Sequence, residues 1–169
     1  MSDDFSSLYG FNRWANDKML DACRKLAAEQ FIAEPVPGWT PVRTTVWHIA
    51  IVTEGWLKAI TDSPDQSFPA ETEVVSPDDA AKILDRAYAI FDSLSPTLTA
   101  EYLNTPKTLS RRGRTAVFPA WIVLRHVVNH TTYHRGQVAS KLKRFGIQQT
   151  DTDLVYWALQ QMPQAKGVG

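Results

Sequence analysis

An all-α fold built on a four-helix bundle is the structure that this sequence predicts. Four long segments carry apolar residues at steps of three and four, which is the spacing of one face of an amphipathic helix. The chain has 169 residues, of which 44% are hydrophobic, so it can bury one core without disulfide or metal support. No internal repeat or change of composition divides it, and we therefore expect a single domain over residues 1–169.

Two helices are expected in the first sixty residues. The first covers residues 5–28 along an apolar stripe that ends near Leu26. Residues 31–39, FIAEPVPGW, contain two prolines and a glycine without any period, and this pattern predicts a loop. The second helix is expected to run to about residue 60, with Thr40 as N-cap and Pro41 as first residue, because the missing amide hydrogen of proline costs nothing there.

Three further helices are expected in the rest of the chain. The first covers residues 76–94, where Ser76 is the expected N-cap and is followed by a proline and two acids. Residues 95–118 are rich in Pro, Gly, Thr, Ser and Arg, and they predict a long loop or a small hairpin. The longest helix is expected over residues 119–146 and a short one over residues 153–161. Because the connections are long, at least one should cross the bundle, which disfavours an up-down-up-down order.

Charge and cysteine content exclude several kinds of protein. Lys and Arg together number 18, as do Asp and Glu, so no net field attracts nucleic acid or an anionic membrane. The first ten residues, MSDDFSSLYG, do not resemble a signal peptide, and no stretch approaches the ~20 apolar residues of a membrane span. Cys23, the single cysteine, cannot form an internal disulfide and is expected in the core. We expect a cytoplasmic protein without nucleic-acid or membrane partners.

Three of the four histidines, His126, His130 and His134, follow one another at steps of four in the longest helix. Neighbours in this set are about 6 Å apart along the axis and the outer two about 12 Å, so one ion can take two of them. At 100° per residue, His130 and His134 project with the apolar stripe, whereas His126 falls at its edge. His130 and His134 are therefore the expected pair.

His48 is expected to complete the site from the second helix. It lies on the face that includes Trp56 and opposite a polar side that includes Glu54. Three inward imidazoles from two helices, His48, His130 and His134, predict a divalent metal site with a position left for water or substrate. The alternative for each single histidine is a core residue bonded to a backbone carbonyl. A shared cation is favoured for the adjacent pair because each buried imidazole needs a partner.

Several neighbouring side chains are candidates to contact the metal-binding imidazoles. Gln137 and His126 are the two that helical phase places nearest, with interhelical hydrogen bonding as the alternative for Gln137. Arg135 flanks the site and is expected in surface or interhelical hydrogen bonds. Tyr133 is expected to be a core residue.

Other catalytic motifs are absent from the sequence. Thr131 and Thr132 stand where an HExxH protease needs its glutamate, and no GxSxG, CxxC, P-loop or GxGxxG pattern occurs. No catalytic residue beyond the metal site is therefore expected. The basic residues Arg111, Arg112 and Arg114 predict a solvated hairpin tip, with binding of an anionic thiol or of a partner as the alternative.

Four segments resemble the DinB/YfiT-like superfamily. HVVNHTTYHRGQ, residues 126–137, resembles its C-terminal signature, and FNRWANDKML, residues 11–20, resembles its first-helix motif. TTVWHIAIVTEGWL, residues 44–57, is similar to its second-helix histidine segment, and TDTDLVYW, residues 150–157, to its closing short helix. The resemblance spans nearly the whole chain in order.

The resemblance implies a four-helix bundle of up-down-down-up topology with a short additional C-terminal helix, often as a homodimer. It also implies a metal ion held by the residues that match the family's three histidines: His48, His130 and His134. The ion would be zinc or nickel, although three imidazoles also accept iron or manganese. Characterised branches of the family are thiol-dependent transferases and a maleylpyruvate isomerase, and the family name refers to damage-inducible expression.

The leading functional hypothesis is metal-dependent transfer of a low-molecular-weight thiol to an electrophilic small molecule, because a divalent cation favours the nucleophilic thiolate. A hydrolase with metal-activated water would use the same three ligands. A non-enzymatic metal-binding stress protein, in which the surface or the dimer carries the function, is the third alternative.

Overall fold

The computed structural model describes residues 2–111, 113–149 and 151–162, and it shows a mostly helical fold in this part of the chain. Seven α-helices, two single turns of 3-10 helix and one two-stranded sheet are described there. In chain order the elements are α1 (Ser2–Cys23), α2 (Ala28–Ile32), α3 (Val42–Ile60), η1 (Glu71–Glu73), α4 (Pro77–Leu94), η2 (Ser95–Thr97), α5 (Ala100–Asn104), β1 (Pro106–Arg111), β2 (Arg114–Pro119), α6 (Ala120–Arg144) and α7 (Leu154–Gln161).

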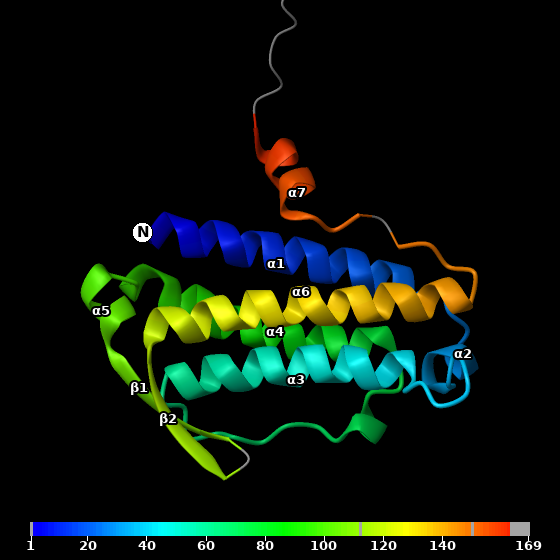
Figure 1. Ribbon diagram of the computed structural model, residues 1–169, viewed down its shortest axis with the longest axis horizontal. Coiled ribbons are helices and arrows are strands. Elements are labelled where there is room, and N and C mark those ends of the chain that lie inside the picture. The colour runs from blue at the N-terminus through cyan, green and yellow to red at the C-terminus, as the bar shows by residue number, and fades with distance from the viewer. Residues whose placement is uncertain (1, 112, 150, 163–169) are drawn as a thin grey trace, which may run out of the picture.

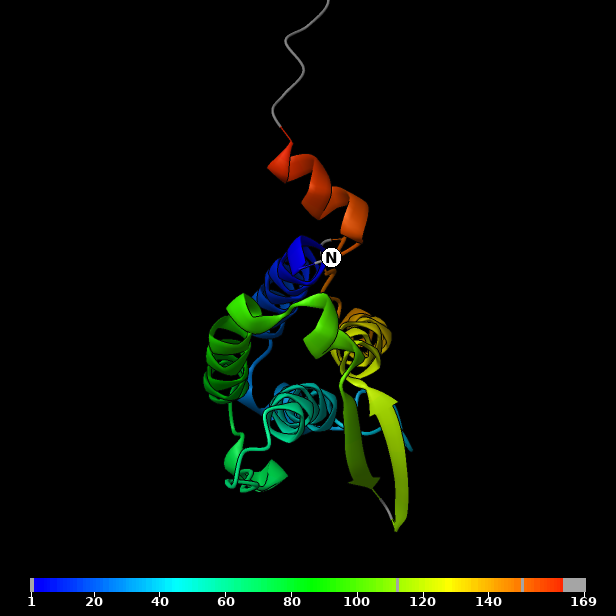
Figure 2. The ribbon, with the colours of Figure 1, turned by 90° about the vertical axis from the view of Figure 1, so that its left-hand side faces the viewer.

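The four long helices, α1, α3, α4 and α6, lie side by side (Figure 1). Seen from the end, they surround a common interior (Figure 2). Helix α1 packs on α4 and α6, and α3 packs on the same two helices. The expected predominance of helix and the number of long helices are confirmed. The pair that matters for the site is α3 and α6.

Two clusters of buried apolar residues hold these helices together. On α6 the first cluster ends at Val128 and the second begins at Val138, so the segment between them carries His130 and His134. Burial of one such leucine- or valine-sized side chain stabilises the fold by about 1.5–3 kcal/mol. Cys23 is buried in the second cluster, as predicted. His130 and His134 thus lie at a level where the apolar core is interrupted.

The ends of α4 and α6 follow from local chemistry. The Ser76 hydroxyl accepts a hydrogen bond from the Asp79 amide at 3.3 Å, and the Asp79 carboxylate accepts one from the Ser76 amide at 3.0 Å. This reciprocal cap satisfies two amides that the first turn of α4 leaves free. Gly146 follows α6 with φ of 76°, the left-handed conformation that glycine adopts most easily. Both predicted boundaries are confirmed.

The helix boundaries before residue 43 differ from the prediction. Helix α1 ends at Cys23, five residues early, and Leu26 packs on the core from the turn that follows it. A separate short helix, α2, then occupies part of the expected loop. Pro41, not Thr40, is the N-cap of α3, and the Thr40 hydroxyl instead accepts a hydrogen bond from the Lys141 ammonium at 2.7 Å.

The segment between α5 and α6 is a small hairpin, which was one of the two predicted alternatives. Strands β1 and β2 pair antiparallel, from Pro106 opposite Pro119 to Arg111 opposite Arg114. Gly113 has φ of 75°, as a tight hairpin turn requires. Arg112 lies outside the described residues. None of the helices that the structure describes combines the length and apolar character needed to cross a membrane.

Candidate metal centre

Three histidines from two helices meet where α3 and α6 lie against each other. His48 comes from α3, and His130 and His134 come from successive turns of α6. One ring nitrogen from each lies within 4.8 Å of the other two. Nε2 of His130 and Nε2 of His134 are 3.2 Å apart, close to the spacing of about 3.4 Å that two nitrogens take on one tetrahedral zinc ion. The side chains therefore fit a single divalent ion.

All three rings are half-buried. The prediction that they point into the core is correct only in part, because the centre of the bundle on α3 is filled by Val46, Ile49 and Ala50. The histidines lie beside this core, in the α3–α6 contact. Each of the three side chains is partly exposed in this position.

Gln137 orients the imidazole of His134. Its Oε1 lies 2.7 Å from His134 Nδ1. An amide oxygen only accepts hydrogen bonds, so Nδ1 carries the proton and Nε2 keeps its lone pair. That lone pair is directed to the side where His130 lies. A hydrogen bond of this kind fixes the ring and its tautomer for metal binding.

His126 extends the row of rings along α6. Its ring centroid lies 5.3 Å from that of His130 and 5.0 Å from that of Trp56. His126 is outside the group of three that fits one ion. Tyr133 also stands next to the site, with its ring centroid 5.0 Å from that of His134. Its predicted core position is wrong, because the side chain is 66% exposed.

Arg135 holds α6 to α1 from the interior side of the histidines. The side chain is 2% exposed. Its Nη1 donates to the Asn12 and Asn16 side-chain oxygens at 2.8 and 3.0 Å, and its Nη2 donates to the Thr132 hydroxyl at 2.7 Å. The Asn16 amide in turn donates to Tyr88 Oη at 2.8 Å. Of the two expected roles for Arg135, the structure shows the interhelical one.

This interior network has two consequences. Burial lowers the pKa of Arg135 to about 10, so the guanidinium stays charged at neutral pH although only neutral oxygens face it in the hydrogen bonds described. Because His134 is the preceding residue on α6, the network also fixes the rotation that turns His134 towards α3. Sequence reasoning missed Asn12 and Asn16. The signal was two asparagines four residues apart beside the apolar stripe of the first helix.

Lys141 makes a second polar contact between α6 and α3. Its ammonium donates to the hydroxyls of Thr40 and Thr45 at 2.7 and 2.5 Å and to the Pro41 carbonyl at 3.1 Å. Burial lowers the pKa of Lys141. The lysine thereby fixes the start of α3, two turns before His48 approaches α6.

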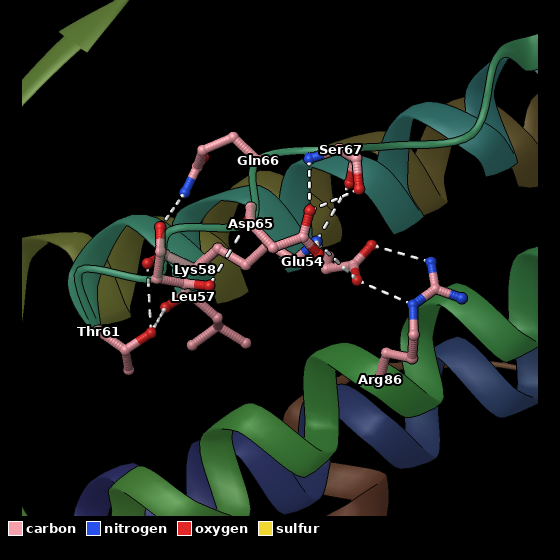
Figure 3. A network of polar contacts seen from close by, with 9 residues as sticks. Glu54, Leu57, Lys58, Thr61, Asp65, Gln66, Ser67 and Arg86 are labelled. Atoms are coloured by element: carbon pink, nitrogen blue, oxygen red, sulfur yellow. Dashed lines mark hydrogen bonds and ion pairs between the residues drawn. The ribbon is translucent and has the colours of Figure 1, made fainter.

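Glu54 lies on the far side of α3 and faces α4 (Figure 3). Its carboxylate accepts from Arg86 Nε at 2.9 Å and Nη2 at 3.1 Å, and Lys58 Nζ lies 3.4 Å away. Glu54 lies away from His48, as its helical phase predicted, and it is buried there, with 1% of its surface exposed. The reason is that α4 covers this face and supplies a cation. The carboxylate is thus engaged away from the histidines.

The fold and the site together define a mostly helical protein with a candidate three-histidine metal centre between two adjacent long helices. The sequence model of the DinB family matches residues 1–165. The chain therefore belongs to the DinB family.

Individual relatives agree with this assignment. Protein DinB of Bacillus subtilis strain 168 is 26% identical over 162 residues, which are 90% of this chain and 92% of that protein. The crystal structure of a DinB-like protein from Bacillus cereus ATCC 10987 is similar with a TM-score of 0.67 at 22% identity, over 88% of this chain and 95% of that one. A DinB-like protein of Bacillus subtilis, YjoA, gives a TM-score of 0.61 at 17% identity, over 88% and 96% of the two chains. These structures support the fold.

Proposed function

We propose that the protein binds one divalent metal ion through His48, His130 and His134 and uses it to transfer a low-molecular-weight thiol to an electrophilic small molecule. The observation that carries the proposal is the convergence of three ring nitrogens within 4.8 Å at a half-buried position. Membership of the DinB family supports it, because the resemblance implied the same three ligands.

In the proposed transfer, the ion would activate the thiol and the side chains would hold the ion. A bound divalent cation lowers the pKa of a thiol and so favours its thiolate. Three imidazoles leave a fourth position for the sulfur, and Gln137 keeps His134 in the tautomer that can bind. In the transfer, sulfur forms a bond to the electrophilic carbon. The thiol proton goes to solvent, and the electron pair of the breaking bond leaves with the leaving group.

The surroundings of the histidines suit a thiol as nucleophile, and the same three ligands would also activate water. The metal-compatible group consists of three histidines without a carboxylate, and Glu54 is engaged by Arg86 on the other side of α3. A metalloprotease of the HExxH type uses a glutamate as general base for its water. A thiol needs less assistance, because its unperturbed pKa is about 8.5 compared with 15.7 for water. Zinc or nickel is the proposed ion, and three imidazoles also accept iron or manganese.

Metal analysis combined with turnover tests this function. Untagged protein should contain one divalent ion per chain, and the His130→Ala variant should lose it, whereas Asn129→Ala, which changes an exposed neighbour, should keep it. Thiol consumption should be followed with 1-chloro-2,4-dinitrobenzene as electrophile and with bacillithiol, mycothiol and glutathione in turn. Metal-dependent release of chloride with one of the thiols is expected. Unchanged metal content in His130→Ala would disprove the ligand assignment, and conversion that needs no thiol would disprove the transfer.

We further propose a cytoplasmic homodimer whose four long helices have the up-down-down-up order of the family. Helix α7 supports the dimer, because none of its residues is buried and it presents apolar side chains, including Leu159 at 60% exposure. Apolar helix faces of this kind commonly mark contacts between proteins. Sedimentation equilibrium should give twice the chain mass, and Leu159→Asp should shift the equilibrium to the monomer. A monomer at all concentrations would contradict the proposal.

A further inference from the structure

A cavity of about 490 Å³ lies along α3 beyond the histidines. Its walls come from α3, from the segment that follows α3, and from β1. The residues that matter for recognition are Ile51, Gly55 and Trp56 of α3, Phe68 of the following segment, and Leu109 of β1. The volume is in the range of about 300–1,000 Å³ that is typical of small-molecule sites.

The cavity lies further along the face of α3 that carries His48, and ring contacts link its wall to the candidate metal centre. Ile51 and Gly55 lie three and seven residues after His48, so they continue the same face of α3. Trp56 lines the cavity and also packs edge-on against His126, with ring centroids 5.0 Å apart. His126 in turn neighbours His130 at 5.3 Å. A continuous row of rings therefore connects the cavity to the metal-binding group.

Ionic contacts fix the wall that follows α3 (Figure 3). Lys58 Nζ donates to the Asp65 carboxylate at 2.9 Å and to the Ser67 carbonyl at 3.1 Å. The same ammonium lies 4.8 Å from the ring centroid of Phe68. The buried Glu54 lies 3.4 Å from Lys58 Nζ and holds it in place. The position of Phe68 against α3 is thus determined before any ligand arrives.

Charge and shape indicate what the cavity accepts. Trp56 and Phe68 provide aromatic faces, and the glycine at 55 provides room, since a Cβ there would come 3.3 Å from Phe68 Cζ. Asp62 is the charged residue among those that line the cavity, and Lys107 neutralises it at 2.8 Å. Serine, threonine and glutamine side chains complete the lining. Such a site favours a flat, uncharged molecule with an apolar body and a few hydrogen-bonding groups.

We propose that this cavity binds the body of the electrophilic substrate, an uncharged molecule with a planar aromatic part, and presents its reactive end past Trp56 towards the three histidines. The identification of the bound molecule as the substrate rests on the proposed function. The existence of an aromatic binding site beside the histidines does not depend on turnover.

Binding of N-phenyl-1-naphthylamine, an uncharged aromatic fluorophore, tests the proposal. The full-length protein should bind one probe per chain with enhanced emission, both with zinc and after removal of zinc with a chelator. Gly55→Leu fills the cavity and should weaken binding by at least about tenfold. Gly136→Leu is the matched control, because nothing lies within 4 Å of a Cβ added at this position on α6, and it should bind as the parent does.

The remaining outcomes separate this inference from the proposed function. Replacing zinc by cobalt should quench the bound probe, because a paramagnetic ion quenches only nearby fluorophores. If Gly55→Leu fails to fold by circular dichroism, Gly55→Ala serves in its place and should weaken binding about threefold, since one carbon is added against Phe68. Equal affinity in the parent and a folded Gly55 variant, or no quenching in protein that has bound cobalt at the histidines, would overturn the inference. A parent protein that binds neither zinc nor cobalt but still binds the probe, with weaker binding in the Gly55 variant, would instead disprove only the proposed function.

Discussion

Single side chains around the histidines decide how well an ion can be held. Gln137 contacts His134 through a hydrogen bond of 2.7 Å on the nitrogen that faces away from His130. Without this acceptor, the His134 ring can turn and can move its proton to the metal-facing nitrogen.

The Gln137→Leu variant should therefore bind zinc about 10–100-fold more weakly than the parent, with an unchanged stoichiometry of one. Competition with a chromophoric chelator measures the affinity. Ser140→Ala, a change at an exposed position one turn further along α6, is the control and should have no effect. Equal zinc affinity in Gln137→Leu and the parent would show that the hydrogen bond does not orient the imidazole.

Arg135 contributes to stability more than a surface arginine does. Arg135→Met removes donors to Asn12, Asn16 and Thr132 and takes from the buried Asn16 oxygen the donor that the structure describes for it, while Asn12 keeps the Thr131 hydroxyl. We expect the free energy of unfolding to fall by about 2–4 kcal/mol. Chemical denaturation measures this loss. Arg24→Met breaks exposed ion pairs with Asp21 and Asp78 and should cost only about 0–1 kcal/mol, so similar losses in the two variants would contradict the interpretation.

Sequence reasoning predicted part of this residue-level picture. The pairing of His130 with His134 and the nearness of Gln137 follow from helical spacing alone. Tyr133 was expected in the core and is exposed, and the burial of Glu54 was not predicted, because each depends on which helix covers that face. Glu54 is stable in the interior since Arg86 reaches it from α4, and helical phase within α3 contains no information about that partner.

At the scale of secondary structure, capping chemistry sets the start of α4. Ser76→Ala removes the acceptor for the Asp79 amide and should lower the free energy of unfolding by about 1 kcal/mol. Thermal or urea unfolding followed by circular dichroism measures the change. Ser93→Ala is the control, because that exposed hydroxyl donates to the Ala89 carbonyl of its own helix and does not cap a helix end. An equal effect at both positions would mean that the cap does not stabilise α4.

Elements with strong local signals were predicted well and others were not. Helices α4 and α6 carry long apolar periods and clear terminal residues, and their bounds agree with the prediction within about two residues. Helix α2 has only five residues, too few to show a period. Thr40 is a residue type that often caps helices, but its hydroxyl instead accepts a hydrogen bond from Lys141 of α6.

At the scale of the whole molecule, metal binding should couple to stability. An ion that binds only the folded chain adds about 2.7 kcal/mol to the free energy of unfolding at a concentration one hundred times its Kd. For a chain of this size the melting temperature should rise by about 5–10 °C. Differential scanning calorimetry with zinc and with excess chelator measures the shift. His130→Ala should show none, and a shift of the same size in that variant would place the ion elsewhere.

The sequence by itself determined that the chain is mostly helical, which residues form the long helices, and that His130 and His134 share one helix face. These properties are local, because hydrogen bonds four residues apart and the spacing of side chains along one helix define them. The sequence also predicted that His48 joins this pair, but only the tertiary structure decided how close it comes, that the group is half-buried beside the core, and that β1 and Phe68 line a cavity further along α3. Those features depend on which surfaces pack together, and packing between distant segments is fixed by the shape and charge of both partners at once.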